Sequence, residues 1–180
     1  MVEDEGMLNT NKMRWDKLKE ECGVFGILDQ DTLPLVEMTY FGLYALQHRG
    51  QESAGMAISD GNNIRHHKGM GLVPEVFDDT ILETLKGGKI AIGHVWHSAE
   101  GENYVYNAQP LVMKYKKGSL ALAHNGNLIN ADNLRSKLEE MGAIFQTSVD
   151  SEVIANLIAR QSDQGLEMAI RNTVAQLEGS

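Results

Sequence analysis

Short apolar runs separated by turn residues predict most of the strands in this chain. Residues 22–28 (CGVFGIL), 53–59 (SAGMAIS) and 89–95 (KIAIGHV) are apolar, short and punctuated or bounded by glycine and polar positions, a pattern typical of buried strands. The turn residues 60–63 (DGNN) join the second run to residues 64–68. They predict a hairpin, because Asp-Gly and Asn-Asn tolerate the positive φ of tight turns.

Apolar positions at helical spacing predict the helices. Pro34 and Gly50 favour a helix start and a helix end, and the apolar stripe between them consists of Leu35, Met38, Gly42, Ala45 and Leu46. Residues 78–88 predict a short helix that ends at two glycines. After a second predicted hairpin over 110–126, further helices are predicted over 130–142, 150–161 and 166–179.

The order of these elements predicts an α+β fold. Because the strands come early in hairpins and the helices are grouped, antiparallel sheets layered with helices fit better than a βαβ repeat. At 180 residues and 42% hydrophobic composition, the chain is long enough for one domain with a core and short for two. We therefore expect one domain over 22–180, preceded by a polar leader over 1–21.

Net charge and cysteine content limit which binding partners and which cellular location are expected. The formal net charge of −9 argues against a nucleic-acid or anionic membrane surface, since these partners require a basic face. The leader has no apolar run, so it is neither a secretory signal nor a membrane span. A single cysteine forms neither an internal disulfide nor a thiolate metal cage, and a cytoplasmic location follows as the expectation.

Cys22, the only cysteine, has two interpretations. A lone intracellular cysteine is most often a small buried apolar residue. As a nucleophile it would instead need a base and an access route; six histidines are present, but no spacing rule ties any of them to Cys22. If the leader is removed, the α-amine of Cys22, with a pKa of about 8, can serve as that base.

Six motifs in a fixed order carry a resemblance to a known family. ECGVFGI, YALQHRGQESAGMA, IGHV, NAQPL, ALAHNGNL and DSEVIA resemble the glutaminase domain of glutamine phosphoribosylpyrophosphate amidotransferases (amidophosphoribosyltransferases), which are class II amidotransferases with an N-terminal nucleophile. The resemblance covers residue 21 to the last residue. It implies an αββα sandwich that releases ammonia from glutamine for phosphoribosylamine synthesis in purine biosynthesis, within a full-length enzyme that forms homo-oligomers.

The resemblance also implies roles for individual residues. Once a leader of 21 residues is removed, Cys22 attacks the carboxamide of L-glutamine and forms a glutamyl thioester, while Asn125 and the backbone N–H of Gly126 stabilise the oxyanion. Arg49 orders the surroundings of the nucleophile, and Asp150 pairs with the α-ammonium of glutamine. Plainer interpretations remain open: Asn-Gly as a hairpin turn, Arg49 as an exposed helix end, and Asp150 as a helix N-cap.

One loop departs from the family pattern. Where the family reads GHVRYST, this chain reads GHVWHSAE over 93–100, so that Trp96, His97, Ala99 and Glu100 differ. The family's arginine grips the substrate α-carboxylate and its threonine helps to hold it, whereas indole offers one neutral donor and alanine none. We expect Trp96 and Ala99 to be substrate-binding positions with impaired recognition of glutamine. The alternative is an inactive or retuned binding or interaction module on the same scaffold.

The resemblance assigns further partners to a second domain. In the family, phosphoribosylpyrophosphate, magnesium and, in some members, an iron–sulfur cluster bind outside the glutaminase domain. The sequence of this chain does not resemble the phosphoribosyltransferase domain. The chain is also expected to stop before the last strands of the glutaminase domain, which would leave an unpaired sheet edge. Neither the adjacent pair His66 and His67 nor the pair His94 and His97 has the spacing of a preformed metal site, so no metal is expected in this chain.

Overall fold

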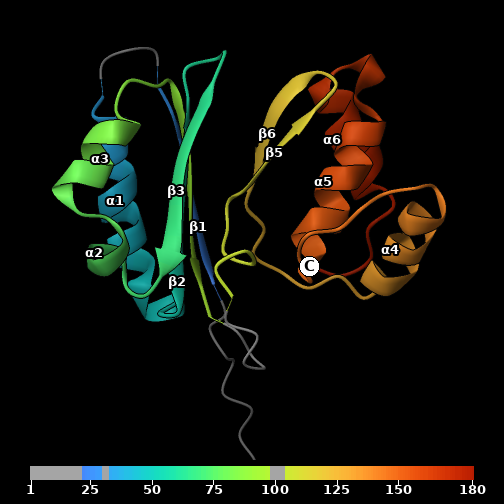
Figure 1. The fold of residues 1–180 in the computed structure, drawn as a ribbon, viewed down its shortest axis with the longest axis horizontal. Coiled ribbons are helices and arrows are strands. Elements are labelled where there is room, and N and C mark those ends of the chain that lie inside the picture. The colour runs from blue at the N-terminus through green and yellow to red at the C-terminus, as the bar shows by residue number, and fades with distance from the viewer. Residues whose placement is uncertain (1–21, 30–32, 98–103) are drawn as a thin grey trace, which may run out of the picture.

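Four antiparallel strands form the larger sheet of the computed structural model, which describes residues 22–29, 33–97 and 104–180. The strands are β1 (Gly23–Leu28), β2 (Ser53–Ser59), β3 (Ile64–Met70) and β4 (Ile90–Trp96), in the order β1-β4-β2-β3 (Figure 1). Gly23 lies opposite Val95, and Ser53 lies opposite Trp96. This register brings the start of β1, the start of β2 and the end of β4 to one end of the sheet.

Three helices cover one face of this sheet: α1 (Leu35–Leu46), α2 (Val73–Val76) and α3 (Asp79–Leu85) (Figure 1). Because side chains alternate along a strand, Ala91 and Val95 of β4 share a core with residues of this helical layer. Gly93, between them, allows α1 to approach closely, since a Cβ there would lie 2.9 Å from Leu43. Burial of apolar surface therefore holds the helices to the sheet.

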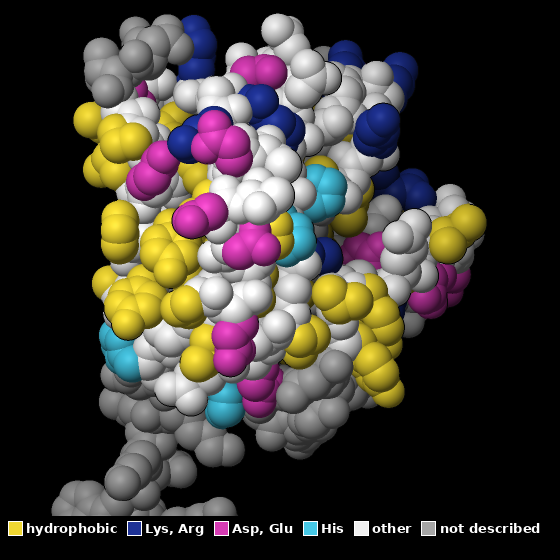
Figure 2. Space-filling view, turned by 60° about the vertical axis from the view of Figure 1, so that its left-hand side comes forward, with side chains coloured by type: hydrophobic (Ala, Val, Ile, Leu, Met, Phe, Trp, Pro, Cys, Tyr) yellow, Lys and Arg dark blue, Asp and Glu magenta, His cyan; other side chains and the backbone are white. Residues whose placement is uncertain are grey.

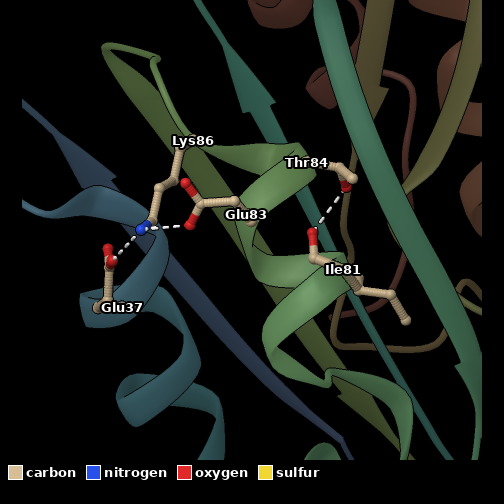
Figure 3. Close-up of polar contacts among 5 residues, drawn as sticks. All are labelled: Glu37, Ile81, Glu83, Thr84 and Lys86. Carbon is tan, nitrogen blue, oxygen red and sulfur yellow. Dashed lines mark hydrogen bonds and ion pairs between the residues drawn. The ribbon is translucent and has the colours of Figure 1, made fainter.

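The helix α3 is anchored by polar contacts at both ends. At its start, Asp78 accepts a hydrogen bond of 2.8 Å from the backbone N–H of Ile81, as an N-cap residue does. Beyond its last turn, Lys86 lies 2.5 Å from Glu83 and 3.5 Å from Glu37 of α1 (Figure 3). These charged side chains are exposed, so the ion pairs contribute little to stability and the apolar contacts dominate.

A second, two-stranded sheet faces the inner side of the first. It contains β5 (Leu111–Tyr115) and β6 (Gly118–Leu122), and the helices on its far side are α4 (Ala131–Glu140), α5 (Asp150–Arg160) and α6 (Leu166–Val174) (Figure 1). Leu120 of β6 belongs to one core cluster with Ile154 and Ala169 of the helices. The layers therefore run helix, sheet, sheet, helix, and the predicted α+β class with an αββα arrangement is confirmed.

Most predicted elements are present with small differences at their ends, but the helix predicted over 166–179 is too long: it ends at Val174, and Gly179 forms an isolated bridge with Leu128. Extended structure continues to Met70 in β3 and to Trp96 in β4, past the predicted ends. The short helix α2 and the 3-10 turn η2 (Ser162–Gln164) were not predicted, and the end of the first predicted helix forms the 3-10 turn η1 (Gln47–Arg49). Segments of three or four residues are too short to show a helical period, which is the signal that sequence patterns provide.

The outer face of α1 carries exposed apolar side chains. Met38, Phe41 and Tyr44 are among the large hydrophobic residues that remain accessible there, and Figure 2, which brings the α1 side forward, shows apolar side chains beside acidic ones.

Within the described parts of the chain, no helix has the length and apolar character needed to cross a bilayer.

Candidate active site

Cys22 immediately precedes β1, and hydrogen bonds to Arg49 and Asn125 hold its backbone. Its N–H donates to the carbonyl of Arg49 (3.1 Å), and its own carbonyl accepts hydrogen bonds from Arg49 Nε (2.9 Å) and Asn125 Nδ2 (3.4 Å). The φ of 62° is unusual for a residue with a side chain and costs about 1–2 kcal/mol. The surrounding hydrogen bonds therefore maintain a strained conformation at the candidate nucleophile.

The Cys22 side chain is nearly buried, with 8% of its surface exposed. Its Sγ lies 3.9 Å from the carbonyl oxygen of His97, just past the end of β4. The prediction of a small buried cysteine at the start of a strand is correct as a description of burial. The backbone conformation and the convergent donors are what distinguish this position from an ordinary core cysteine.

Arg49 reaches Cys22 because the turn after α1 is organised by Gln47. The side-chain amide of Gln47 donates to the carbonyl of Gly50 (2.6 Å) and accepts from the N–H of Val73 (2.6 Å). Gly50 then packs against the end of β4, where a Cβ would lie 2.6 Å from the Trp96 backbone nitrogen. Arg49, the last residue of η1, is partly buried, and its Nε donates to the backbone carbonyl of the candidate nucleophile.

Asn125 and Gly126 lie in the turn a few residues after β6 ends at Leu122. The structure brings Asn125 to Cys22 through the 3.4 Å hydrogen bond to the Cys22 carbonyl. At Gly126 a side chain is excluded, since a Cβ would lie 1.8 Å from the carbonyl oxygen of Ser180. The Asn-Gly pair thus lies in a crowded turn beside the candidate nucleophile.

Asp150 is the first residue of α5 and connects that helix to the same turn. Its Oδ2 accepts a hydrogen bond of 2.8 Å from the backbone N–H of Leu128. The N-cap position of α5 is Val149, which makes no side-chain cap, so the helix-cap interpretation of Asp150 is wrong. Because Leu128 is three residues from Asn125, the carboxylate lies near the segment that reaches Cys22.

Trp96 is the last residue of β4, one register step beyond the pair of Gly23 and Val95. This step places Trp96 next to Cys22 at the end of the sheet. Its carbonyl accepts from the N–H of Glu52 (3.0 Å), and the Glu52 carboxylate lies 3.4 Å from Nδ1 of the neighbouring His97. The predictions for Ala99 and Glu100 lie outside the described residues.

Asn107 and Gln109 were not predicted as site residues. Both are polar and almost fully buried, at 1% and 5% exposure, and their side chains hold the segments before Asp150 and Asn125. Both lie within the motif NAQPL, which contributed only to the family resemblance. Two amides flanking an alanine in an otherwise apolar context are the sequence signal that could have identified them.

His94 is a further buried polar residue that the sequence did not single out as functional. Its ring is fully buried, and neither ring nitrogen has a hydrogen bond among the residues that the structure describes. Burial lowers the pKa of His94 to about 4, an effect that the nearby His124 backbone only partly offsets. His94 is therefore a neutral imidazole at physiological pH.

The histidines raised as a metal question lie in different surroundings. No cluster of three or more His, Cys, Asp or Glu side chains with ligand geometry occurs in the described ranges. His67 packs edge-on against Phe77, with ring centroids 5.8 Å apart, and the preceding residue, His66, lies on the other face of β3. An iron–sulfur cluster requires several cysteine ligands, and the single cysteine of this chain does not fit that group.

Comparison with known proteins finds similarity between this chain and amidotransferases. Residues 99–180 match the glutamine amidotransferase domain family. Amidophosphoribosyltransferase of Bacillus subtilis (strain 168) is 49% identical over 164 residues, which cover 91% of this chain and 34% of the relative. The enzyme of the same name from Methanocaldococcus jannaschii is 49% identical over 162 residues, covering 88% of this chain and 34% of the relative.

Two solved structures share the fold. One, described as the allosteric regulatory enzyme of purine biosynthesis, superposes with a TM-score of 0.80 at 48% identity, covering 87% of this chain and 33% of that one. The other, glutamine phosphoribosylpyrophosphate amidotransferase from B. subtilis complexed with ADP and GMP, gives a TM-score of 0.77 at 48% identity, with the same coverage. The chain thus spans about a third of the length of the relatives it matches.

Proposed function

We propose that this chain, whose glutamine amidotransferase domain is homologous to the N-terminal region of amidophosphoribosyltransferases, hydrolyses glutamine through a thioester on Cys22 and supplies ammonia for phosphoribosylamine synthesis in purine biosynthesis. One observation carries the proposal. The carbonyl of Cys22 accepts hydrogen bonds from Arg49 and Asn125, which are 27 and 103 residues away in the sequence. Such convergence on a nearly buried cysteine supports a nucleophilic role.

The proposed reaction begins when the Cys22 thiol attacks the carboxamide carbon of glutamine. A carbon–sulfur bond forms, the carbonyl oxygen becomes an oxyanion, and the Asn125 amide with the Gly126 N–H stabilises its charge. The thiol proton passes through the α-amine of Cys22 to the departing nitrogen, which leaves as ammonia. Water then hydrolyses the thioester and releases glutamate.

The α-amine exists only after the leader over 1–21 is removed, and we include that cleavage in the proposal. In the intact chain the Cys22 nitrogen donates to the Arg49 carbonyl over 3.1 Å. After cleavage the same carbonyl can accept a hydrogen bond from the amine and orient its lone pair toward the thiol. An amine with a pKa of about 8 accepts a proton near neutral pH.

Substrate recognition is the part of the proposal most affected by this chain's own residues. The Asp150 carboxylate, oriented by the Leu128 N–H, is assigned to the α-ammonium of glutamine. Trp96 stands where the family has the arginine that binds the α-carboxylate, so one charge-assisted interaction is lost. This substitution favours a second candidate function, an inactive or retuned binding or interaction module on the same scaffold.

The remaining partners are proposed for the part of the relatives' length that this chain does not cover. We assign phosphoribosylpyrophosphate and magnesium to a separate phosphoribosyltransferase domain, and we propose a cytoplasmic location and, for the full-length enzyme, a homo-oligomer. The acidic net charge of −9 supports a small-molecule substrate over a nucleic acid or an anionic membrane.

Intact mass and ammonia release together test the proposed function. The chain is prepared to begin at position 22, its mass is verified, and ammonia is measured at high glutamine for wild type and Cys22→Ser. We expect thiol-dependent release that falls at least a hundredfold in the variant. Equal rates in both proteins would contradict the nucleophile assignment, and no release from verified wild type together with undetectable glutamine binding would favour the second candidate.

A further inference from the structure

We infer that Asn107 and Gln109 are positioning residues that hold the two sides of the proposed glutamine site in register. The inference rests on the proposed function and adds residues to its site. The two side chains are two positions apart on one segment, yet one holds the residue before Asn125 and the other holds the loop before Asp150. The segment therefore connects the oxyanion side with the ammonium side.

Gln109 pairs with both backbone groups of His124. Its Oε1 accepts from the His124 N–H (2.8 Å), and its Nε2 donates to the His124 carbonyl (3.3 Å). A side-chain amide thus takes the place of a neighbouring strand just beyond the end of β6. Because His124 directly precedes Asn125, this contact limits rotation of the peptide that leads into the proposed oxyanion donors.

Asn107 makes the corresponding contact with Ser148. Its Nδ2 donates to Ser148 Oγ (3.1 Å), and its Oδ1 accepts from the Ser148 N–H (3.3 Å). Ser148 lies two residues before Asp150. The same loop is held from its other side by Arg135, which donates to the carbonyls of Thr147 (3.1 Å) and Val149 (3.2 Å).

The segment that carries both amides is itself fixed to the four-stranded sheet, whose first strand follows Cys22. Lys68 of β3 donates from Nζ to the carbonyls of Ala108 (2.6 Å) and Tyr106 (3.2 Å). The carbonyl of Gln109 lies directly over Gly55 of β2, where a Cβ would be 2.1 Å away. Both side-chain amides are buried and each makes two hydrogen bonds, all of which an apolar replacement would remove.

The two residues are expected to affect different kinetic constants. Gln109→Leu should lower kcat for glutamine hydrolysis about tenfold or more with little change in KM, since it loosens the oxyanion side. Asn107→Leu should raise KM about fivefold or more with a smaller change in kcat, since it loosens the ammonium side. The conservative variants Gln109→Glu and Asn107→Asp keep the acceptor for the backbone N–H and should recover part of each loss.

Matched controls separate positioning from general loss of stability. Gln161→Leu removes a part-buried amide that contacts Thr173, and Asn156→Leu removes one that contacts the Glu152 carbonyl. Both sites lie away from Cys22, so these variants should leave kcat and KM unchanged. Equal effects of the control and test variants, or identical kinetic changes in Asn107→Leu and Gln109→Leu, would overturn the inference.

Amide hydrogen exchange tests the two contacts without relying on catalysis. In the chain beginning at position 22, protection should be lost at His124 only in Gln109→Leu and at Ser148 only in Asn107→Leu. Unchanged protection at both amides would overturn the inference even if activity fell. If wild type releases no ammonia, the proposed function fails, and residue-specific loss of protection would still support the positioning contacts.

Discussion

The side-chain amide of Asn125 donates to the carbonyl oxygen of Cys22 over 3.4 Å, although 103 residues separate the two in sequence. The contact places a side-chain amide donor beside the proposed nucleophile before any substrate binds. Such preorganisation is the main source of oxyanion stabilisation in acyl transfer.

Replacing this donor should affect the rate more than binding. We expect Asn125→Leu to lower kcat for glutamine hydrolysis by about 10²–10³ while KM changes little, because the amide acts on charge that develops in the transition state. Steady-state ammonia release from the chain beginning at position 22 measures both constants. The matched variant Asn130→Leu, whose side chain contacts Gln176 and Glu178, should retain the wild-type kcat.

Restoring an arginine at position 96 should improve glutamine binding. A charge-assisted hydrogen bond contributes about 1.5–3 kcal/mol, so Trp96→Arg should lower KM about ten- to a hundredfold. Trp96→Lys is the control, since lysine brings the charge without the planar fork and should improve KM less. An unchanged KM in Trp96→Arg would show that the loop does not bind the α-carboxylate.

Protonation of His94 should make stability depend on pH in a defined window. Burial lowers its pKa from 6.5 to about 4, so the unfolded chain binds more protons than the folded chain between these values. The free energy of unfolding is therefore not reduced by His94 above pH 6.5, and it decreases as the pH falls from 6.5 toward 4. From pH 7 to pH 5, His94 should lower the free energy of unfolding by about 2 kcal/mol.

Urea unfolding at the two pH values measures this effect. The contribution of His94 is the difference in pH dependence between wild type and His94→Gln. The comparison is needed because burial, Lys68 and His67 also lower the pKa of His66, which changes the free energy of unfolding with pH in the same direction. His124, the titratable neighbour of His94, is present in both proteins. An equal pH dependence in wild type and His94→Gln would contradict the assignment.

A methyl group at Gly55 should displace the segment that holds Asn107 and Gln109. Since a Cβ there would lie 2.1 Å from the Gln109 carbonyl oxygen, Gly55→Ala should destabilise the fold by about 1–3 kcal/mol and lower ammonia release. Gly26→Ala is the matched control in the same sheet, because no atom lies within 4 Å of its Cβ. Similar stabilities of the two variants by thermal or urea unfolding would show that the close approach at Gly55 is unimportant.

Local patterns accounted for most elements and for the chemically prominent site residues. Apolar runs and helical stripes located the strands and helices to within a few residues, because both periods are properties of short segments. Cys22 drew attention as the only cysteine, and Arg49, Asn125 and Asp150 followed from the motifs around them. The short helix α2 escaped because four residues carry no periodic signal.

The sequence by itself determined most of the elements, the αββα class and the residues that resemble an amidotransferase site. Only the tertiary structure decided that β4 lies between β1 and β2, that Cys22 adopts a φ of 62°, and that buried Asn107 and Gln109 hold Ser148 and His124. The reason is physical. Local propensity depends on neighbours along the chain, whereas strand order and buried hydrogen bonds depend on segments that meet only when the core forms.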